Sequence, residues 1–186
     1  HGVGVSAVNA VSELLRLEIK REGKVWFQEY RRGVPQAPLT AIGESSATGT
    51  KVTFKPDHEI FTNLEYNYDI LANRLREFSF LNSGLQVNLV DERAQGRKET
   101  YQYKGGIREF VSLLAQAKEP VHEDVIAFTG DFPTGDGKGT AVVDLALQLT
   151  NSYAEQILPY TNNIHNKDGG RHLTGLPAAL TPSTHP

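Results

Sequence analysis

A short segment of strictly alternating polarity, followed by a turn and a second strand pattern, constrains the fold of this chain most strongly. In the first, Leu15, Leu17 and Ile19 alternate with charged residues, which is the period-two pattern of a half-buried strand. A turn at residues 22–23 leads into a second strand over residues 24–31. The chain therefore needs a sheet with one face turned toward a core.

Hairpin patterns and single helical patterns follow one another, without the regular strand–helix alternation of a parallel sheet. This order predicts an α+β fold with a largely antiparallel sheet. We expect helices over residues 6–15, 68–83 and 107–114, and Gly84 as a left-handed cap of the second. The expected further strands cover residues 50–54, 85–89, 101–103, 125–129 and 141–149.

Length and composition exclude several classes of protein. The 186 residues, 39% hydrophobic, fit one large domain or two small ones. No apolar run approaches the roughly 20 residues that span a bilayer, and no signal peptide is visible. The absence of cysteine excludes disulfides and thiolate metal sites, and a formal charge of −3 excludes a global basic field for nucleic acids.

A pair of glycines opens the chain directly before an amphipathic segment. Gly2 and Gly4 leave the backbone without side-chain bulk, and the amide groups at a helix start can hold a phosphate. Glycines in this position more often form only a tight turn, so the pattern alone leaves both interpretations open. Because the first residue is His rather than Met, we expect the chain to be an internal piece of a longer protein.

Five collinear stretches resemble the B subunits of bacterial DNA gyrase, type II topoisomerases with an ATPase of the GHKL superfamily. They cover nearly the whole chain, and the forms VPQAPL, FLNSG and TNNI favour gyrase over the sister topoisomerase IV subunit. The stretches are HGVGVSAVNAVSE (1–13), REGKVWFQEYRRGVPQAPL (21–39), TGTKVTFKPD (48–57), RLREFSFLNSG (74–84) and TNNIHNKDGGRHLTG (161–175).

The resemblance implies the C-terminal part of a two-layer GHKL ATPase sandwich over residues 1–105, then the first part of a transducer domain over residues 106–186. It implies ATP and Mg²⁺ as cofactors, a gyrase A subunit and duplex DNA as partners, dimerisation on ATP binding, a cytoplasmic location and no membrane contact. The alternatives are a topoisomerase IV B-type subunit and a GHKL-like interaction module that has lost catalysis.

The same resemblance assigns roles to three places in the chain. The residues of the ATP lid, whose main-chain amides hold the triphosphate, are His1, Gly2, Val3, Gly4 and Val5. Thr50 would reach the adenine pocket, although a threonine at this position is ordinarily a strand former. Arg21 would border the pocket and contact aminocoumarin inhibitors, although by charge alone it is a solvated strand end.

No catalytic residue or metal ligand is expected in this chain, because the family's general base and its Mg²⁺-ligating asparagine precede residue 1. Glu59 and Asn63 have a similar spacing, but they follow Pro56 in a segment without helical pattern, so we interpret the spacing as coincidence. The chain by itself is therefore predicted not to hydrolyse ATP.

Three further motifs have simple structural interpretations. The six histidines show no pair at the spacing of zinc ligands on a helix, which argues against a zinc site. The run 135–139 lacks the ending of a phosphate loop and predicts a hairpin connection. Residues 168–170 predict a turn into a helix; because Pro177 costs such a helix about 3 kcal/mol, the last ten residues need not continue it.

Overall fold

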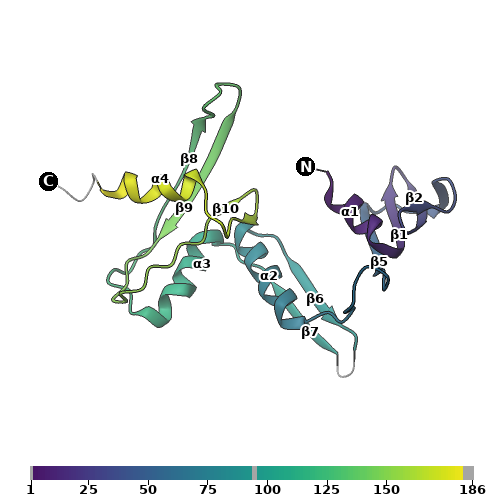
Figure 1. The fold of residues 1–186 in the computed structure, drawn as a ribbon, viewed down its shortest axis with the longest axis horizontal. Coiled ribbons are helices and arrows are strands. Elements are labelled where there is room, and N and C mark those ends of the chain that lie inside the picture. Colours follow the sequence, from purple (N-terminus) through teal and green to yellow (C-terminus); the bar gives the residue numbers. More distant parts are fainter. Residues whose placement is uncertain (1, 94–95, 182–186) are drawn as a thin grey trace. The chain divides into compact units, whose positions relative to one another are not determined.

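The computed structural model describes residues 2–93 and 96–181. Its contacts divide the chain into two compact units, residues 1–66 and residues 67–186. Figure 1 colours the first unit from purple to blue and the second from teal to yellow. Each unit has its own sheet and helix arrangement and is described by itself. None of the described helices is long and apolar enough to cross a bilayer.

The first unit is one helix and one antiparallel sheet. Strand β1 is central, with β5 on one side and β2 on the other, and the outer edge of β2 pairs with β4 and then with β3. The elements are α1 (Gly4–Ala10), β1 (Ser12–Arg21), β2 (Lys24–Arg31), β3 (Val34–Pro35), β4 (Thr40–Glu44) and β5 (Gly49–Pro56).

Strand β1 has a hydrogen-bonded partner on both edges. Leu15 lies opposite Tyr30 of β2 and Phe54 of β5, and its side chain is only 1% exposed. The predicted strands over 15–19, 24–31 and 50–54 are confirmed, and the turn at 22–23 has positive φ at Glu22 and Gly23, as a tight hairpin requires.

The predicted helix over residues 6–15 is wrong in its second half. Helix α1 ends at Ala10, and Ser12 already belongs to β1, where Ser12 pairs with Pro56 and Leu14 with Lys55. Backbone pairing on the sheet outweighs the helical spacing of Val8 and Val11, since local propensity is worth only tenths of a kcal/mol per residue. The short strands β3 and β4 lie between β2 and β5, in a segment for which no strand was predicted.

The second unit combines helices with separate two-stranded hairpins (Figure 1). The predicted helices over 68–83 and 107–114 and the predicted strands are confirmed, with ends shifted by a few residues. The elements are α2 (Tyr68–Leu81), β6 (Val87–Asp91), β7 (Arg97–Tyr101), α3 (Gly106–Ala115), a 3₁₀ turn (Gln116–Lys118), β8 (Ile126–Pro133), β9 (Thr140–Leu147), β10 (Tyr160–Thr161), β11 (Ile164–His165) and α4 (Arg171–Leu180).

An aromatic stack forms the centre of this unit. Phe80 of α2 is 1% exposed and lies between two rings, with centroid distances of 3.6 Å to Tyr103 and 4.7 Å to Phe110. The Asn67 side chain caps the start of α2 by accepting from the Ile70 amide, and Gly84 has the predicted positive φ after its end. The stack therefore joins α2, the segment after β7, and α3.

Helix α3 packs in both directions along the chain. It contacts β9, and it also packs on α2, where Phe110 stacks on Phe80. Gly106, with φ of 59°, starts the helix close to Ser83. The compact units divide after Tyr66, and the domain boundary at residues 105–106 stays a prediction.

Helix α4 continues through its proline. The turn at residues 168–170 feeds a helix as predicted, and this helix includes Pro177 and ends at Leu180. Pro177 stands in the seventh position and lacks the N–H that would donate to the Leu173 carbonyl. Thr181 caps the end of the helix by donating its hydroxyl to the Pro177 carbonyl at 2.8 Å. The proline thus weakens the helix without ending it there.

Candidate nucleotide-binding site

The glycine-containing segment lies open at the start of the first unit. Gly2 has φ of 79°, helix α1 begins at Gly4, and the flanking Val3 and Val5 are 69% and 55% exposed. A β-carbon built on Gly4 meets nothing within 4 Å. The amides of this segment are accessible to an anion, although a seven-residue helix adds only a small dipole. His1 lies outside the described residues.

Thr50 and Arg21 belong to the same end of the sheet. Thr50 pairs with Ile19 across β1 and β5, and Arg21 follows Ile19 by two residues. The Thr50 side chain is exposed, and within the described ranges its hydroxyl makes no hydrogen bond, so it is free to bind a ligand. The Arg21 guanidinium makes an ion pair of 3.2 Å with Glu22, and both side chains are 75% exposed.

These candidate residues come from two different elements of the first unit. Helix α1 packs on β1 and β5, so the segment 2–5 belongs to the same layer pair as Thr50. Among the described residues, however, no hydrogen bond or ion pair joins segment 2–5 to Thr50 or Arg21. The structure thus presents them as separate open groups and not as a closed pocket.

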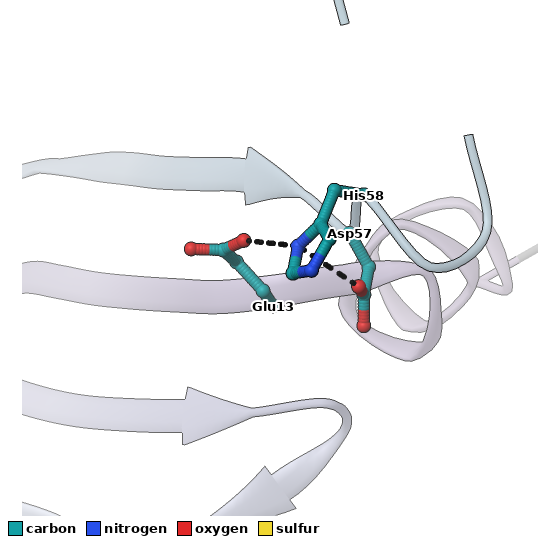
Figure 2. A group of neighbouring side chains, drawn as sticks. All are labelled: Glu13, Asp57 and His58. Atoms are coloured by element: carbon teal, nitrogen blue, oxygen red, sulfur yellow. Dashed lines mark hydrogen bonds and ion pairs between the residues drawn. The ribbon is translucent and has the colours of Figure 1, made fainter. Parts of the chain in front are cut away.

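A second cluster of titratable side chains in this unit was not predicted from the sequence. Figure 2 shows the His58 ring between the carboxylates of Glu13 and Asp57; its Nδ1 lies 3.3 Å from Glu13 Oε2 and 3.8 Å from Asp57 Oδ1. The ligand atoms of all three lie within 4.8 Å of one another, a spacing that metal sites also show. The sequence signal is only that Glu13 is the second residue of β1, while residues 57–58 follow the neighbouring strand β5.

Cations of the chain already hold both carboxylates of this cluster. Lys55 Nζ lies 2.7 Å from Glu13 Oε1, and Arg32 Nε lies 2.8 Å from Asp57 Oδ2, whose side chain is only 3% exposed. The hydrogen bond from Lys55, followed by that from His58, lowers the pKa of Glu13. A metal ion would compete with these partners, so the cluster acts as an ion-pair network that fastens the end of β5.

The residues that imitate a catalytic pair have structural roles. Glu59 makes an ion pair of 2.6 Å with Arg32, and Asn63 accepts a hydrogen bond from the Glu65 amide. Both lie in the irregular segment after β5, as predicted. The glycine-rich run 135–139 is the turn of the β8–β9 hairpin, where Thr134 donates to Asp136 and to the Gly139 carbonyl. In the part of the chain that the structure describes, both features thus make structural contacts.

Comparison with known proteins defines the class first. The structure is similar to the crystal structure of the 43K ATPase domain of Thermus thermophilus gyrase B in complex with an aminocoumarin, with a TM-score of 0.82 and 38% identity. The match covers 96% of this chain and 47% of that one. The chain therefore has the mixed, antiparallel fold of a gyrase-type ATPase domain, which confirms the predicted fold class.

Sequence relatives give the particular family. The chain is 45% identical to the DNA gyrase B protein of Clostridium acetobutylicum and 43% identical to that of Thermotoga maritima, over 97% of its own length and 28% of theirs. Residues 106–184 match the family model described as DNA gyrase B. This chain belongs to the DNA gyrase B family and spans less than a third of the length of these relatives.

Proposed function

We propose that this chain forms part of the ATP-binding and transducer region of a gyrase B-type subunit, which couples ATP hydrolysis to DNA strand passage and negative supercoiling. The observation that carries the proposal is the similarity, over 96% of the chain, to an ATPase domain of a gyrase B. A fold alone does not fix a function, but 38% identity along the same chain supports a shared site as well.

The proposed triphosphate contacts are the main-chain amides of Gly2, Val3, Gly4 and Val5, together with His1. The exposure of Val3 and Val5 and the open space at Gly4 support this role, because a phosphate must approach the backbone closely. The side chains contribute little chemistry. Nucleotide would therefore bind through hydrogen bonds from N–H groups to phosphate oxygens.

The proposed base and inhibitor contacts lie at one end of the sheet. The Thr50 hydroxyl both donates and accepts hydrogen bonds, which suits recognition of an adenine edge. Arg21 is proposed to contact aminocoumarins, the inhibitor class bound in the similar structure from Thermus thermophilus. Its single exposed ion pair with Glu22 is weak and leaves the guanidinium available to a ligand.

The whole protein is proposed to use ATP with Mg²⁺, to act with a gyrase A subunit on duplex DNA, to dimerise on ATP binding and to work in the cytoplasm. The proposed division is an ATPase part over residues 1–105 and a transducer part from residue 106. The family match that begins at Gly106 supports this division.

We predict that the 186-residue chain alone does not hydrolyse ATP. Of the residues that imitate the catalytic pair, Glu59 is held by Arg32, so it is not poised to activate a water molecule. Phosphate release, measured with Mg²⁺ and excess ATP, should equal that of a heat-denatured control. Turnover above that control would show that a general base lies inside these residues.

A plasmid topology assay tests the proposed function of the full-length protein. With its A-type partner and ATP, relaxed plasmid should become negatively supercoiled, and a non-hydrolysable analogue should not support repeated cycles. Relaxation or decatenation without negative supercoiling would instead identify a topoisomerase IV-type subunit. A protein that binds no nucleotide and leaves the linking number unchanged would be the interaction module, and the proposal would be wrong.

A further inference from the structure

A side-chain hydrogen bond connects two segments of the second unit that are far apart in the chain. The Asn163 Nδ2 group donates to Asn82 Oδ1 at 3.0 Å, across a sequence separation of 81 residues. Asn82 ends helix α2, and Asn163 stands in the turn between β10 and β11. The bond thus ties a hairpin of only two residues per strand to the end of a long helix.

The orientation of the Asn82 amide is fixed by its other contact. Its Nδ2 group donates to the Phe78 carbonyl at 2.8 Å, and its backbone N–H donates to the same carbonyl at 3.1 Å. A carbonyl can only accept, so the amide nitrogen must face α2 and the oxygen must face outward. Asn82 therefore presents an acceptor to the hairpin because it caps the helix.

The Asn163 side chain is held by the geometry of its turn. Asn162 and Asn163 have φ of 48° and 65°, the conformation of a two-residue hairpin turn that asparagine tolerates well. The Tyr160 ring of the same hairpin lies next to the His165 ring, with the centroids 5.1 Å apart and the planes tilted by 31°. Burial, then the charge of the Glu77 carboxylate of α2, raises the pKa of Tyr160.

We propose that the Asn82–Asn163 hydrogen bond is a latch between the ATP-binding part and the transducer part of the protein. The assignment of the two asparagines to different parts rests on the proposed function and its boundary at residues 105–106. Because the bond is exposed and its net strength is modest, the latch can open and close reversibly. The hairpin, and helix α4 that follows it in the chain, would then move relative to α2 while the chain stays folded.

Hydrogen exchange measured by mass spectrometry on the full-length protein without nucleotide tests the latch. Asn163→Gly removes the donor and keeps the positive φ of the turn, so amides of residues 160–165 should exchange about five-fold faster. Asn162→Gly is the matched control, because Asn162 has a positive φ in the same turn and no side-chain hydrogen bond among the described residues. Equal exchange in the two variants would overturn the latch.

A double-mutant cycle separates the latch from the capping role of Asn82. Asn82→Ala should loosen residues 78–84 through loss of the cap and should also speed exchange in residues 160–165. If the two asparagines act through one bond, the double variant exchanges at 160–165 no faster than the faster single variant. Accelerations that multiply would mean that the residues act independently, and the latch would be wrong.

Nucleotide titration of the same variants distinguishes failure of the latch from failure of the proposed function. If Asn163→Gly does not speed hydrogen exchange in residues 160–165 and the protein still binds ATP, the latch alone is refuted. A protein that shows the exchange effect but binds no ATP would keep the Asn82–Asn163 contact and refute the proposed division into ATP-binding and transducer parts.

Discussion

Different interactions stabilise each of the two units of this chain. In the first, β1 pairs along nearly its whole length with β2 and β5, and a network of ion pairs fastens the end of β5. In the second, the hairpins β6–β7, β8–β9 and β10–β11 do not pair with one another among the described residues. Side chains connect them instead, through the Phe80 stack and the Asn82–Asn163 bond.

This difference predicts where substitutions act. A continuous sheet distributes its stability over many backbone hydrogen bonds, so a single side chain contributes a limited share. A unit assembled from separate hairpins depends on the few side chains that touch several elements. Damage to one of these should be large and confined to the second unit. Trp26, the only tryptophan, lies in β2 and reports on the first unit alone.

The largest expected effect is that of Phe80→Ala. Removal of a 1% exposed ring from between Tyr103 and Phe110 leaves a cavity and should lower the free energy of unfolding of the second unit by about 3–5 kcal/mol. Urea unfolding followed by circular dichroism should show an earlier transition, while the midpoint of Trp26 fluorescence stays unchanged.

Phe78→Ala is the control on the same helix, because Phe78 is 41% exposed. It should move the circular dichroism transition far less. An equal shift of the Trp26 transition by Phe80→Ala would contradict the separation of the two units and would show that they unfold together.

A smaller effect, in the other unit, is expected for Asp57→Ala. This change removes the carboxylate that the Arg32 Nε group and the Glu59 amide contact, and leaves Arg32 only its ion pair with the Glu59 side chain. The loss should cost the first unit about 1–3 kcal/mol. Here the Trp26 midpoint should move and the transition of the second unit should not. Glu18→Ala, which breaks an exposed pair with Lys51, is the control and should change stability by less than about 1 kcal/mol. An equal cost for both would remove the claimed role of the network.

Sequence reasoning succeeded where a pattern is local. Alternation predicted β1, the turn at residues 22–23 predicted β2 after it, a helical stripe predicted α3, and the cap at Gly84 predicted the end of α2. It failed where tertiary pairing decides, as at residues 12–15, which follow a helical period but join the sheet. Short strands such as β10 and β11 carry too few residues for any period to show.

The candidate site was predictable only in part, for a related reason. The glycines of segment 2–5 are visible as a motif, and the resemblance supplied Thr50 and Arg21. The Glu13–Asp57–His58 network depends on the register between β1 and β5, which brings residues 45 positions apart together. No local pattern encodes such a register, so sequence reasoning could not find the network.

The smallest effect concerns the acid sensitivity of the β6–β7 hairpin. Hydrogen bonds from the Arg93 side chain and then its backbone amide lower the pKa of Asp91 to about 2. A carboxylate with a depressed pKa stabilises the folded state above its unfolded pKa of about 3.9, and this contribution is lost as the pH falls toward 2. Asp91→Asn should make the hairpin insensitive to pH in this window.

Carboxyl NMR titration combined with hydrogen exchange of residues 87–101 measures this effect. Asp131→Asn in β8 is the control, because the Asp131 carboxylate has no hydrogen bond or ion pair in the described part of the chain. A titration of Asp91 near its ordinary value, with no change in hairpin protection, would contradict the role of the Arg93 contacts.

The central claim, that segment 2–5 binds a nucleotide, is tested most directly by calorimetry of a non-hydrolysable ATP analogue on the full-length protein. In Gly4→Val, the added β-carbon has no atom of the chain itself within 4 Å. The same holds for Gly43→Val in β4, which is therefore the matched control. The account predicts that Gly4→Val weakens binding at least about ten-fold, because it blocks close approach of the phosphates, while Gly43→Val leaves the Kd unchanged. The same Kd for both variants would contradict it.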